Sequence, residues 1–467
     1  MKEDEMVIKK LLIANRGEIV PRVMRACREL GIKTVAVYSD ADRGMSYLNE
    51  ADEAYNIGPA NPLKSYLNID AIINALKASG ADAVHPGYGF LSENALFAET
   101  VSASGATWVG PPPPVLKAID SKCFCRKIAT DAGVPVVPGT INTINEVNEV
   151  YQFAARYGYP IVLKLDKGGG GKGIELVKEE SQVKGAFERL SRIGLMAFGH
   201  PECYIEKEVN SPRHIEIQFL ADKYGNCICL GERECSVQRR YQKIIEESPS
   251  PVVNENERKR LFDYTRQLAL AMGYEGAGTM EFLRSADGHF YFMEINARLQ
   301  VEHPVTELIT GIDIVKKQLS IAAGEKIAIG QEDVTFQGHA IEARVYAEDP
   351  VTFCPSPGTV KKLSFPVMNG NALRIDHALE EGVAVPPYYD PLLAKVIAWG
   401  ATRREAIERL RDALAGFGIE GIKTTIPVNL LILNNEKFVL GEIDTGFIET
   451  LNLKENKDLL KPLWPCL

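Results

Sequence analysis

Apolar and polar residues follow two different periods along the first part of the chain. Short apolar runs at 10–14, 34–38, 53–57, 83–84 and 107–109 predict strands, whereas 18–30 and 69–79 have the spacing of amphipathic helices. Strands that alternate with helices in this way predict a doubly wound parallel sheet. The four prolines at 111–114 can continue neither a helix nor a central strand, so we expect the first unit to end there.

The rest of the chain predicts further α/β units. A helix is expected at 121–132, and the segment 134–138 leads into a smaller region of helices and strands that ends near Val209. From His214 onwards the pattern is mixed α/β and is at first mostly strand. We therefore expect an α/β protein divided at 1–121, 122–209, 210–335 and 336–467.

Composition narrows the range of partners and compartments. The net charge of −9 opposes binding to nucleic acid, and no apolar run approaches the roughly 18 residues that cross a membrane. The first residues are acidic, unlike a secretory signal, so we expect a cytoplasmic protein. The nine cysteines lack C-x-x-C spacing, which favours free thiols over a zinc site.

A glycine-rich stretch follows one predicted strand. The strand at 160–165 contains Lys164 and leads into four consecutive glycines at 168–171, including Gly170 and Gly171. Glycines let backbone N–H groups close on phosphate oxygens, and the lysine would add a positive charge. The P-loop pattern is absent, so we expect another type of phosphate-binding loop. A surface hairpin without function is the alternative.

Two carboxylates are expected to face each other on a hairpin. The runs 279–283 and 290–294 are joined through Asp287-Gly288, which favours a two-residue turn. Counting outward from that turn pairs Ala286 with His289 and Glu281 with Glu294. Directly opposed carboxylates repel each other, and a Mg²⁺ or Mn²⁺ ion between them would remove the repulsion.

The alternation continues beyond this hairpin. Asn296, Arg298, Gln300 and Glu302 fall on one side, with apolar residues on the other. An amide, a guanidinium, a second amide and a carboxylate on one face indicate a functional polar site rather than the usual polar residues of a strand surface. An exposed strand would alternate in the same way, so the pattern alone leaves both interpretations open.

At this point the sequence resembles biotin carboxylases of the ATP-grasp superfamily. The resemblance is carried by Asn15 to Ile19, His85 to Asn94, Lys164 with its glycines, Glu294 to Pro304 and Glu342 to Asp349. It extends to about Thr425, and the stretch Arg298 to Pro304 is its most specific part. It implies a doubly wound N-terminal domain (1–121), an ATP-grasp part with a glycine-loop lid (122–209), an ATP-grasp catalytic part (210–335) and a mixed α/β C-terminal domain (336–467).

The resemblance also implies roles for individual residues. Nucleotide contacts would come from Lys122, Lys164, Gly170, Gly171, His214, Gln238 and Tyr241, with Glu206, Lys207, Glu208 and Val209 as the adenine hinge. Two Mg²⁺ or Mn²⁺ ions would be held by Glu281, Glu294 and Asn296. Bicarbonate would bind Lys243, Arg298, Gln300 and Val301, with Glu302 as the base, and Arg344 would stabilise deprotonated biotin.

The implied reaction has partners outside the chain. ATP and bicarbonate would give carboxyphosphate, and its carboxyl group would pass to biotin. A biotinyl lysine usually lies in an Ala-Met-Lys-Met type of sequence, and the only Met-Lys step here is Met1-Lys2, so we expect biotin on a separate carrier protein. A carboxyltransferase subunit and a homodimer are further expectations, and the final acceptor is left open.

Two departures and two alternatives accompany the resemblance. The family usually has histidine at Tyr241 and small residues at Asp166 and Lys167, which affects expectations for nucleotide affinity. One alternative is another ATP-grasp ligase that joins an acyl phosphate to an amine. The other is a nucleotide-sensing subunit without chemistry. The first would not account for Arg298 to Glu302 together with Arg344, and the second would need Glu302 or Lys243 to be lost, whereas both are present.

Overall fold

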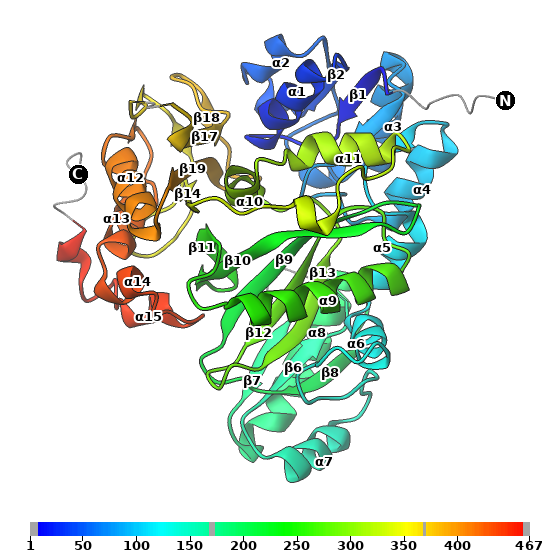
Figure 1. The fold of residues 1–467 in the computed structure, drawn as a ribbon, viewed down its shortest axis with the longest axis vertical. Helices are drawn as coiled ribbons and strands as arrows, with labels where there is room; N and C mark the ends of the chain where they lie inside the picture. The colour runs from blue at the N-terminus through cyan, green and yellow to red at the C-terminus, as the bar shows by residue number, and fades with distance from the viewer. Residues whose placement is uncertain (1–7, 168–172, 368–369, 461–467) are drawn as a thin grey trace.

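The computed structural model describes residues 8–167, 173–367 and 370–460. Met1-Lys2 and the expected phosphate-binding glycines Gly170 and Gly171 lie outside the described residues. Within the described part, no helix has the length and apolar character needed to cross a membrane. The expected α/β class is confirmed, and the molecule is built on one parallel and one large antiparallel sheet (Figure 1).

The N-terminal unit is the doubly wound sheet that the alternating pattern predicts. Its five strands run in the order β3-β2-β1-β4-β5, and all are parallel. They are β1 (Lys10–Ile13), β2 (Lys33–Tyr38), β3 (Glu53–Asn56), β4 (Ala83–His85) and β5 (Thr107–Trp108), with helices α1 (Ile19–Glu29), α2 (Tyr47–Glu50), α3 (Ile69–Ser79) and α4 (Ala95–Ala103). The prolines after β5 start a helix, α5 (Pro113–Ile119), because the first helical turn needs no N–H donors.

A smaller antiparallel sheet follows helix α6 (Lys122–Asp131). It has the order β7-β6-β8, from β6 (Ile161–Leu165), β7 (Ile174–Val177) and β8 (Cys203–Lys207), and it is flanked by α7 (Val147–Tyr157) and α8 (Val183–Phe198). We call residues 139–207 the lid unit. Among the described residues, its hydrophobic core is formed within the stretch from Ile144 to Ile205.

The chain enters and leaves the lid unit at one place. Gly139 forms an antiparallel bridge with Glu206, so the two connections run side by side. A Cβ atom at Gly139 would lie 2.4 Å from the backbone oxygen of Ile205, which only glycine avoids.

The large sheet has eight strands in the order β13-β12-β9-β10-β11-β14-β19-β17. They are β9 (Arg213–Ala221), β10 (Cys227–Arg239), β11 (Gln242–Ser248), β12 (Gly276–Arg284), β13 (Phe290–Asn296), β14 (His339–Tyr346), β17 (Leu373–His377) and β19 (Leu392–Gly400). Helices α9 (Glu255–Ala271), α10 (His303–Thr310), α11 (Ile314–Ala322), α12 (Arg403–Ala415), α13 (Ile426–Leu433), α14 (Glu436–Leu440) and α15 (Phe447–Thr450) complete this part, with the short strands β15 (Gly358–Thr359), β16 (Lys362–Ser364), β18 (Ala384–Val385) and β20 (Gly418–Glu420).

The N-terminal unit and the large sheet share their cores. One cluster joins Leu12, Val84 and Trp108 to Ile217 and Phe282, and helix α11 packs with Ile13 and Val23 in another. In Figure 1 the parallel sheet lies at the upper end, the large sheet in the middle and the lid unit at the lower end. These layers surround the cavity described next.

Candidate active site

The expected site residues meet around one cavity of about 1450 Å³. Predicted site residues from the lid unit and from the large sheet both line it. The lining includes Lys122, Lys164, Glu206, Lys207, Glu208, Val209, His214, Gln238, Tyr241, Lys243, Glu281, Glu294, Asn296, Arg298, Gln300, Val301 and Arg344. Glu302 is the exception, since it is completely buried and contacts the lining residues Lys243 and Arg344.

The β12–β13 hairpin places Glu281 directly opposite Glu294, as predicted, although by another route. The expected two-residue turn is wrong. The Ser285 N–H donates to the oxygen of His289 and the Gly288 N–H to that of Ser285, so the loop has three residues, with Gly288 at a φ of 86°. A bulge between Glu281 and Phe282 shifts the register back by one residue.

Both carboxylate oxygens of Glu281 contact nitrogen atoms of neighbouring side chains. His214 Nε2 lies 2.9 Å from its Oε2, while Lys243 Nζ at 3.1 Å and Asn296 Nδ2 at 2.7 Å contact its Oε1. Burial alone would raise the pKa of Glu281, but the nearby Lys243 and His214 lower it far below the ordinary range. The pKa of His214 is raised, since the attraction of Glu281 outweighs burial.

Glu294 has the opposite character. Burial and then the charge of Glu281 raise its pKa, with Lys122 opposing them. A divalent cation beside both carboxylates would remove the repulsion between them, and oxygen ligands of this kind suit Mg²⁺ or Mn²⁺. The residues present therefore fit a hard divalent cation on this hairpin face.

Beyond β13 the chain is no longer a strand, but Asn296, Arg298 and Gln300 still line the cavity together. Arg298 donates from Nη2 to Asn296 Oδ1 and from Nη1 to Gln300 Oε1, each at 3.0 Å. Its Nε donates to Glu93 Oε2 at 2.9 Å, which ties this stretch to the N-terminal unit. The guanidinium is thereby oriented before any substrate arrives.

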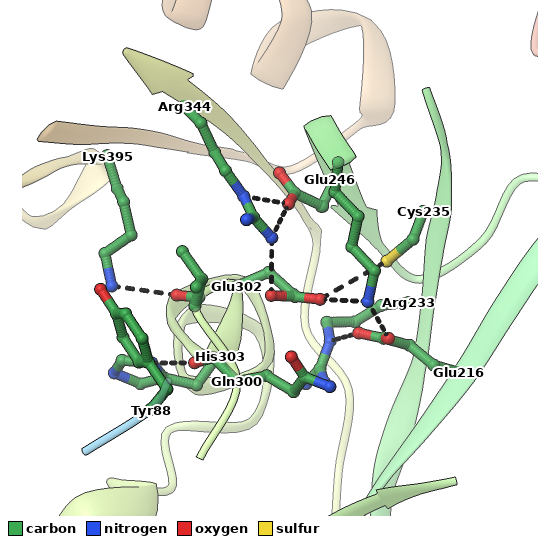
Figure 2. A network of polar contacts seen from close by, with 12 residues as sticks. Tyr88, Glu216, Arg233, Cys235, Glu246, Gln300, Glu302, His303, Arg344 and Lys395 are labelled. Carbon is green, nitrogen blue, oxygen red and sulfur yellow. Dashed lines mark hydrogen bonds and ion pairs between the residues drawn. The ribbon is translucent and has the colours of Figure 1, made fainter. Parts of the chain in front are cut away.

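Glu302 lies between the cations Lys243 and Arg344, which line the cavity, and Figure 2 shows its contact with Arg344. Its Oε1 accepts from Lys243 Nζ at 2.6 Å and its Oε2 from Arg344 Nη2 at 2.9 Å. Burial would raise the pKa of Glu302, but Lys243 and Arg344 bring it below the ordinary value despite the nearby Glu216. Glu302 is therefore ionised at neutral pH and able to accept a proton.

Lys243 also pairs with Glu216 at 2.5 Å, and Glu216 in turn pairs with Arg233 at 2.5 Å. Although burial opposes it, the pKa of Glu216 is lowered to about 2 by Arg233 and Lys243. We call Glu216, Lys243, Glu281, Glu302 and Arg344 the floor of the cavity. Its three carboxylates face Lys243, Arg344 and the adjoining Arg233, and all of these groups except the partly exposed Lys243 are buried.

The lid unit contributes one cation from β6. Lys164 Nζ lies 2.5 Å from Glu206 Oε2, and Arg126 holds the other oxygen of the same carboxylate. The Glu206 side chain is therefore bound within the protein, and the hinge Glu206 to Val209 faces the cavity from the end of β8. Lys207 Nζ donates to the backbone oxygen of Gly158 at 3.1 Å.

Gln238 and Tyr241 lie at the β10–β11 hairpin. Gln238 Nε2 is 3.4 Å from His214 Nδ1, which links it to the Glu281 cluster. Tyr241 and Arg240 form a two-residue turn with φ of 65° and 50°, and Tyr241 is 59% exposed. Left-handed backbone at two residues with side chains costs about 1 kcal/mol or more each.

Sequence reasoning missed several residues of the site. Glu216, Arg233, Glu246, Glu93 and Tyr88 were assigned no role, yet all contact site residues or line the cavity. A signal existed for Glu216, because His214, Glu216 and Gln218 alternate with Ile215 and Ile217 in β9, where every residue after Arg213 is buried. Polar residues at alternate positions of such a strand indicate a functional face.

Comparison with protein families matches three models along the chain. They are described as "Biotin carboxylase, N-terminal domain" over residues 7–116, "Carbamoyl-phosphate synthase L chain, ATP binding domain" over 121–329 and "Biotin carboxylase C-terminal domain" over 342–450. Together these matches extend over both the parallel sheet and the large antiparallel sheet.

Similar proteins agree with these matches. The chain is 49% identical to "Biotin carboxylase 1" of Bacillus subtilis (strain 168), over 96% of this chain and 99% of that protein. A biotin carboxylase–β,γ-ATP complex from Campylobacter jejuni superimposes with a TM-score of 0.93 at 41% identity, over 95% and 99% of the two chains.

A second solved structure has a more specific title. The biotin carboxylase domain dimer of Hydrogenobacter thermophilus 2-oxoglutarate carboxylase, in complex with MgADP, ADP and bicarbonate, has a TM-score of 0.92 at 43% identity, over 97% and 99% of the two chains. That protein therefore combines the same fold with a nucleotide and with bicarbonate.

Proposed function

Because this chain belongs to the biotin carboxylase family, we propose that it carries out the first half-reaction of a biotin-dependent carboxylase. It is an ATP-dependent ligase that carboxylates biotin. The comparisons favour neither another ATP-grasp ligase nor a nucleotide-sensing subunit. The observation that carries the proposal is Glu302, a buried carboxylate held between Lys243 and Arg344 beside Arg298.

The nucleotide is proposed to lie between the lid unit and the large sheet. Lys122, Lys164, Gly170, Gly171, His214, Gln238 and Tyr241 would contact it, and Glu206 to Val209 would border adenine. The support is that every described member of this set lines the cavity. Lys164 would exchange its contact with Glu206 for phosphate oxygens, which bind a lysine as a point charge.

Two divalent ions, Mg²⁺ or Mn²⁺, are proposed at Glu281, Glu294 and Asn296. When bound they would offset charge on the phosphoryl group that is transferred. The protein's own contribution is the register that sets the two carboxylates opposite each other and the raised pKa of Glu294, which a cation would reverse. Asn296, at the end of β13, would add its amide oxygen.

Bicarbonate is proposed to bind Lys243, Arg298, Gln300 and Val301. Glu302 would take its proton, which sharpens the attack of a bicarbonate oxygen on the γ-phosphorus and gives carboxyphosphate with loss of ADP. The lowered pKa of Glu302 supports this role, because an ionised carboxylate is needed. Closing the cavity would protect carboxyphosphate from water.

Biotin is proposed to follow in the same place. Carboxyphosphate breaks down to CO₂ and phosphate, the phosphate takes the ureido proton, and the biotin nitrogen attacks CO₂. Arg344 would stabilise the negative ureido oxygen during this step, as a preoriented guanidinium does for a developing anion. Its contacts with Glu246 and Glu302 fix that orientation.

The remaining assignments are proposals about the setting. We propose that biotin arrives on a separate carrier protein, that a carboxyltransferase subunit uses the product, and that the chain works as a cytoplasmic homodimer. The division at 1–121, 122–209, 210–335 and 336–467 is also kept as a proposal. The acceptor acid is left open, and a pull-down of the biotinylated partner would identify the pathway.

The test is ATP hydrolysis that depends on bicarbonate and rises with free biotin. Glu302→Ala and Arg298→Ala are expected to reduce biotin carboxylation at least about 100-fold with the fold intact, since each removes a group from the bicarbonate pocket. Exposed residues provide the matched controls Glu442→Ala and Arg192→Ala, which should behave as the parent. Near-normal turnover of either site variant would refute the assignment.

A further inference from the structure

Two buried carboxyl groups lie opposite each other directly behind Arg344. Glu246 on β11 is the register partner of Glu342 on β14, and both side chains are completely buried. Opposed like charges on neighbouring strands destabilise a sheet, and they do so most strongly when water is excluded. Glu281 and Glu294 on the β12–β13 hairpin line the cavity, where a cation could lie between them, but neither Glu246 nor Glu342 is among the lining residues.

The hydrogen bonds of this pair are unequal. Glu246 Oε1 accepts from Arg344 Nε at 2.5 Å, whereas its Oε2 has no donor among the described residues. Neither oxygen of Glu342 has a donor within the described part of the chain. A buried carboxylate without donors costs several kcal/mol, and such a group normally takes up a proton instead.

The neighbouring cations are already engaged. Lys395 and Arg344 are the cations whose charges act on Glu342, and Glu246 and Glu302 are the carboxylates that act on it. Arg344 pairs with Glu246 and Glu302, and Lys395 lies 3.1 Å from Glu18, 2.9 Å from the oxygen of Val301 and 3.8 Å from Asp376. Lys243 also faces Glu246, but it binds Glu216, Glu281 and Glu302.

The direction of titration agrees with this geometry. Burial raises the pKa of Glu342 well above its usual range, Lys395 opposes the rise, and Glu246 adds to it. Burial likewise raises the pKa of Glu246 to about 7, although Arg344 lowers it. Glu342 is the member without a guanidinium contact, so the proton belongs on its side.

We propose that Glu246 and Glu342 share one proton as a carboxylic acid–carboxylate pair, and that this pair positions the Arg344 guanidinium for biotin. The protonated Glu342 donates to Glu246 Oε2, and the pair carries a single negative charge. Arg344 then keeps its Nη2 on Glu302, 2.9 Å away. The consequence for biotin rests on the proposed function, whereas the shared proton does not.

The shared proton has a function because Arg344 is balanced between two carboxylates. If both members of the pair were ionised, the guanidinium would be drawn toward Glu246 and away from Glu302. If Glu246 were neutral, Arg344 would be left to Glu302 alone. One negative charge on the pair holds the guanidinium in place even after Glu302 has accepted the bicarbonate proton. Glu246 and Glu342 are thus positioning residues.

The proton can be observed directly by infrared spectroscopy of the full chain without substrates. We expect the C=O stretching band of a buried carboxylic acid in the parent at pH 7, and its loss in Glu342→Gln. Glu442→Gln, at an exposed position, is the matched control and should leave the band unchanged. If the spectra of the parent and of Glu342→Gln showed the same carboxylic acid bands, the proposal would be overturned.

Kinetics with free biotin test the positioning role. Glu342→Gln keeps an N–H donor toward Glu246, so kcat/KM for biotin should stay within about threefold of the parent, whereas Glu342→Leu should lower it about tenfold or more. The parent should lose biotin turnover at alkaline pH as the pair loses its proton, and Glu342→Gln should lack that loss. Equal effects of Gln and Leu, or an unchanged alkaline limb in Glu342→Gln, would contradict it.

Two further readouts separate this proposal from the proposed function. Glu246→Gln should lower kcat/KM for biotin at least about tenfold more than it lowers that for bicarbonate-dependent ATP hydrolysis, because Arg344 loses its ionised partner. A smaller difference would count against a positioning role. If the parent consumed no ATP with bicarbonate, the proposed function would fail while the infrared band still decided on the proton.

Discussion

The floor of the cavity and the lid unit both place charged side chains at the cavity, but they are attached to different parts of the fold. The floor residues come from several strands of the large sheet and from the turn before α10. The floor carboxylates Glu216, Glu281 and Glu302 face Lys243, Arg344 and the adjoining Arg233, and all of these except the partly exposed Lys243 are buried. The lid unit brings Lys164, tied to Glu206, on a three-stranded sheet with its own core.

The difference shows where each kind of substrate recognition can be built. Bicarbonate, the substrate proposed for the floor, is small, so a pocket for it needs charges fixed to a fraction of an ångström. A sheet whose cores continue into the N-terminal unit provides that rigidity. A nucleotide is large and must enter and leave. A unit with a separate core can move as a body while keeping its own contacts.

The largest effect is expected from removing the cation at the centre of the floor. Lys243→Met leaves Glu216, Glu281 and Glu302 without their shared ammonium, and breaking a buried ion pair costs about 3–5 kcal/mol. We expect a lower urea midpoint together with loss of bicarbonate-dependent ATP hydrolysis. An unchanged midpoint would mean that the floor is not a preorganised unit.

The next test separates the two cores. Leu163 and Phe282 are completely buried, the first in the lid core and the second in the shared core. Leu163→Ala should cost about 2–5 kcal/mol and raise hydrogen exchange only between residues 144 and 205. Phe282→Ala should cost about 3–5 kcal/mol and raise hydrogen exchange in both the N-terminal unit and the large sheet. Mass spectrometry of the exchanged peptides distinguishes these outcomes.

Acid should weaken the floor through Glu216. Its pKa is lowered from 4.5 to about 2, so its charge contributes roughly 3 kcal/mol that is present above pH 4.5 and is lost as the pH falls toward 2. The stability difference between the parent and Glu216→Gln, from urea unfolding, should therefore shrink between pH 5 and pH 2. A difference that stays constant over this range would contradict the lowered pKa.

The smallest effect belongs to the lid cation. Lys164→Met should raise KM for ATP about tenfold and leave the urea midpoint nearly unchanged, because Arg126 still binds Glu206. KM for bicarbonate serves as the internal control and should not follow. A matching rise for bicarbonate would show that the lid and the floor are not independent.

Much of this molecule could be predicted because its local signals agree with its fold. The parallel sheet follows from alternating strands and helices, and the facing of Glu281 and Glu294 follows from counting residues on a hairpin. That count succeeded through two compensating differences. A three-residue loop shifted the register by one residue, and the bulge after Glu281 shifted it back.

The floor could be predicted only in part, because its contacts join residues far apart in the sequence. Glu302 and Arg344 were assigned roles by resemblance, but the ion pair between them depends on how β14 packs beside α10. Nothing in the sequence indicated that Glu246 and Glu342 face each other, since their opposition is a matter of register between β11 and β14. Local periodicity does not specify which strands become neighbours.

The bridge between Gly139 and Glu206 bears on how such enzymes can be recombined. Since the chain crosses into and out of one unit at a single point, that unit can be transplanted from a relative by two adjacent joints, provided that glycine is retained at the first. A joint within the prolines at 111–114 would instead divide apolar packing that both halves require. Natural and engineered chimaeras should therefore be able to exchange the lid unit, whereas the N-terminal unit and the large sheet should come from one parent.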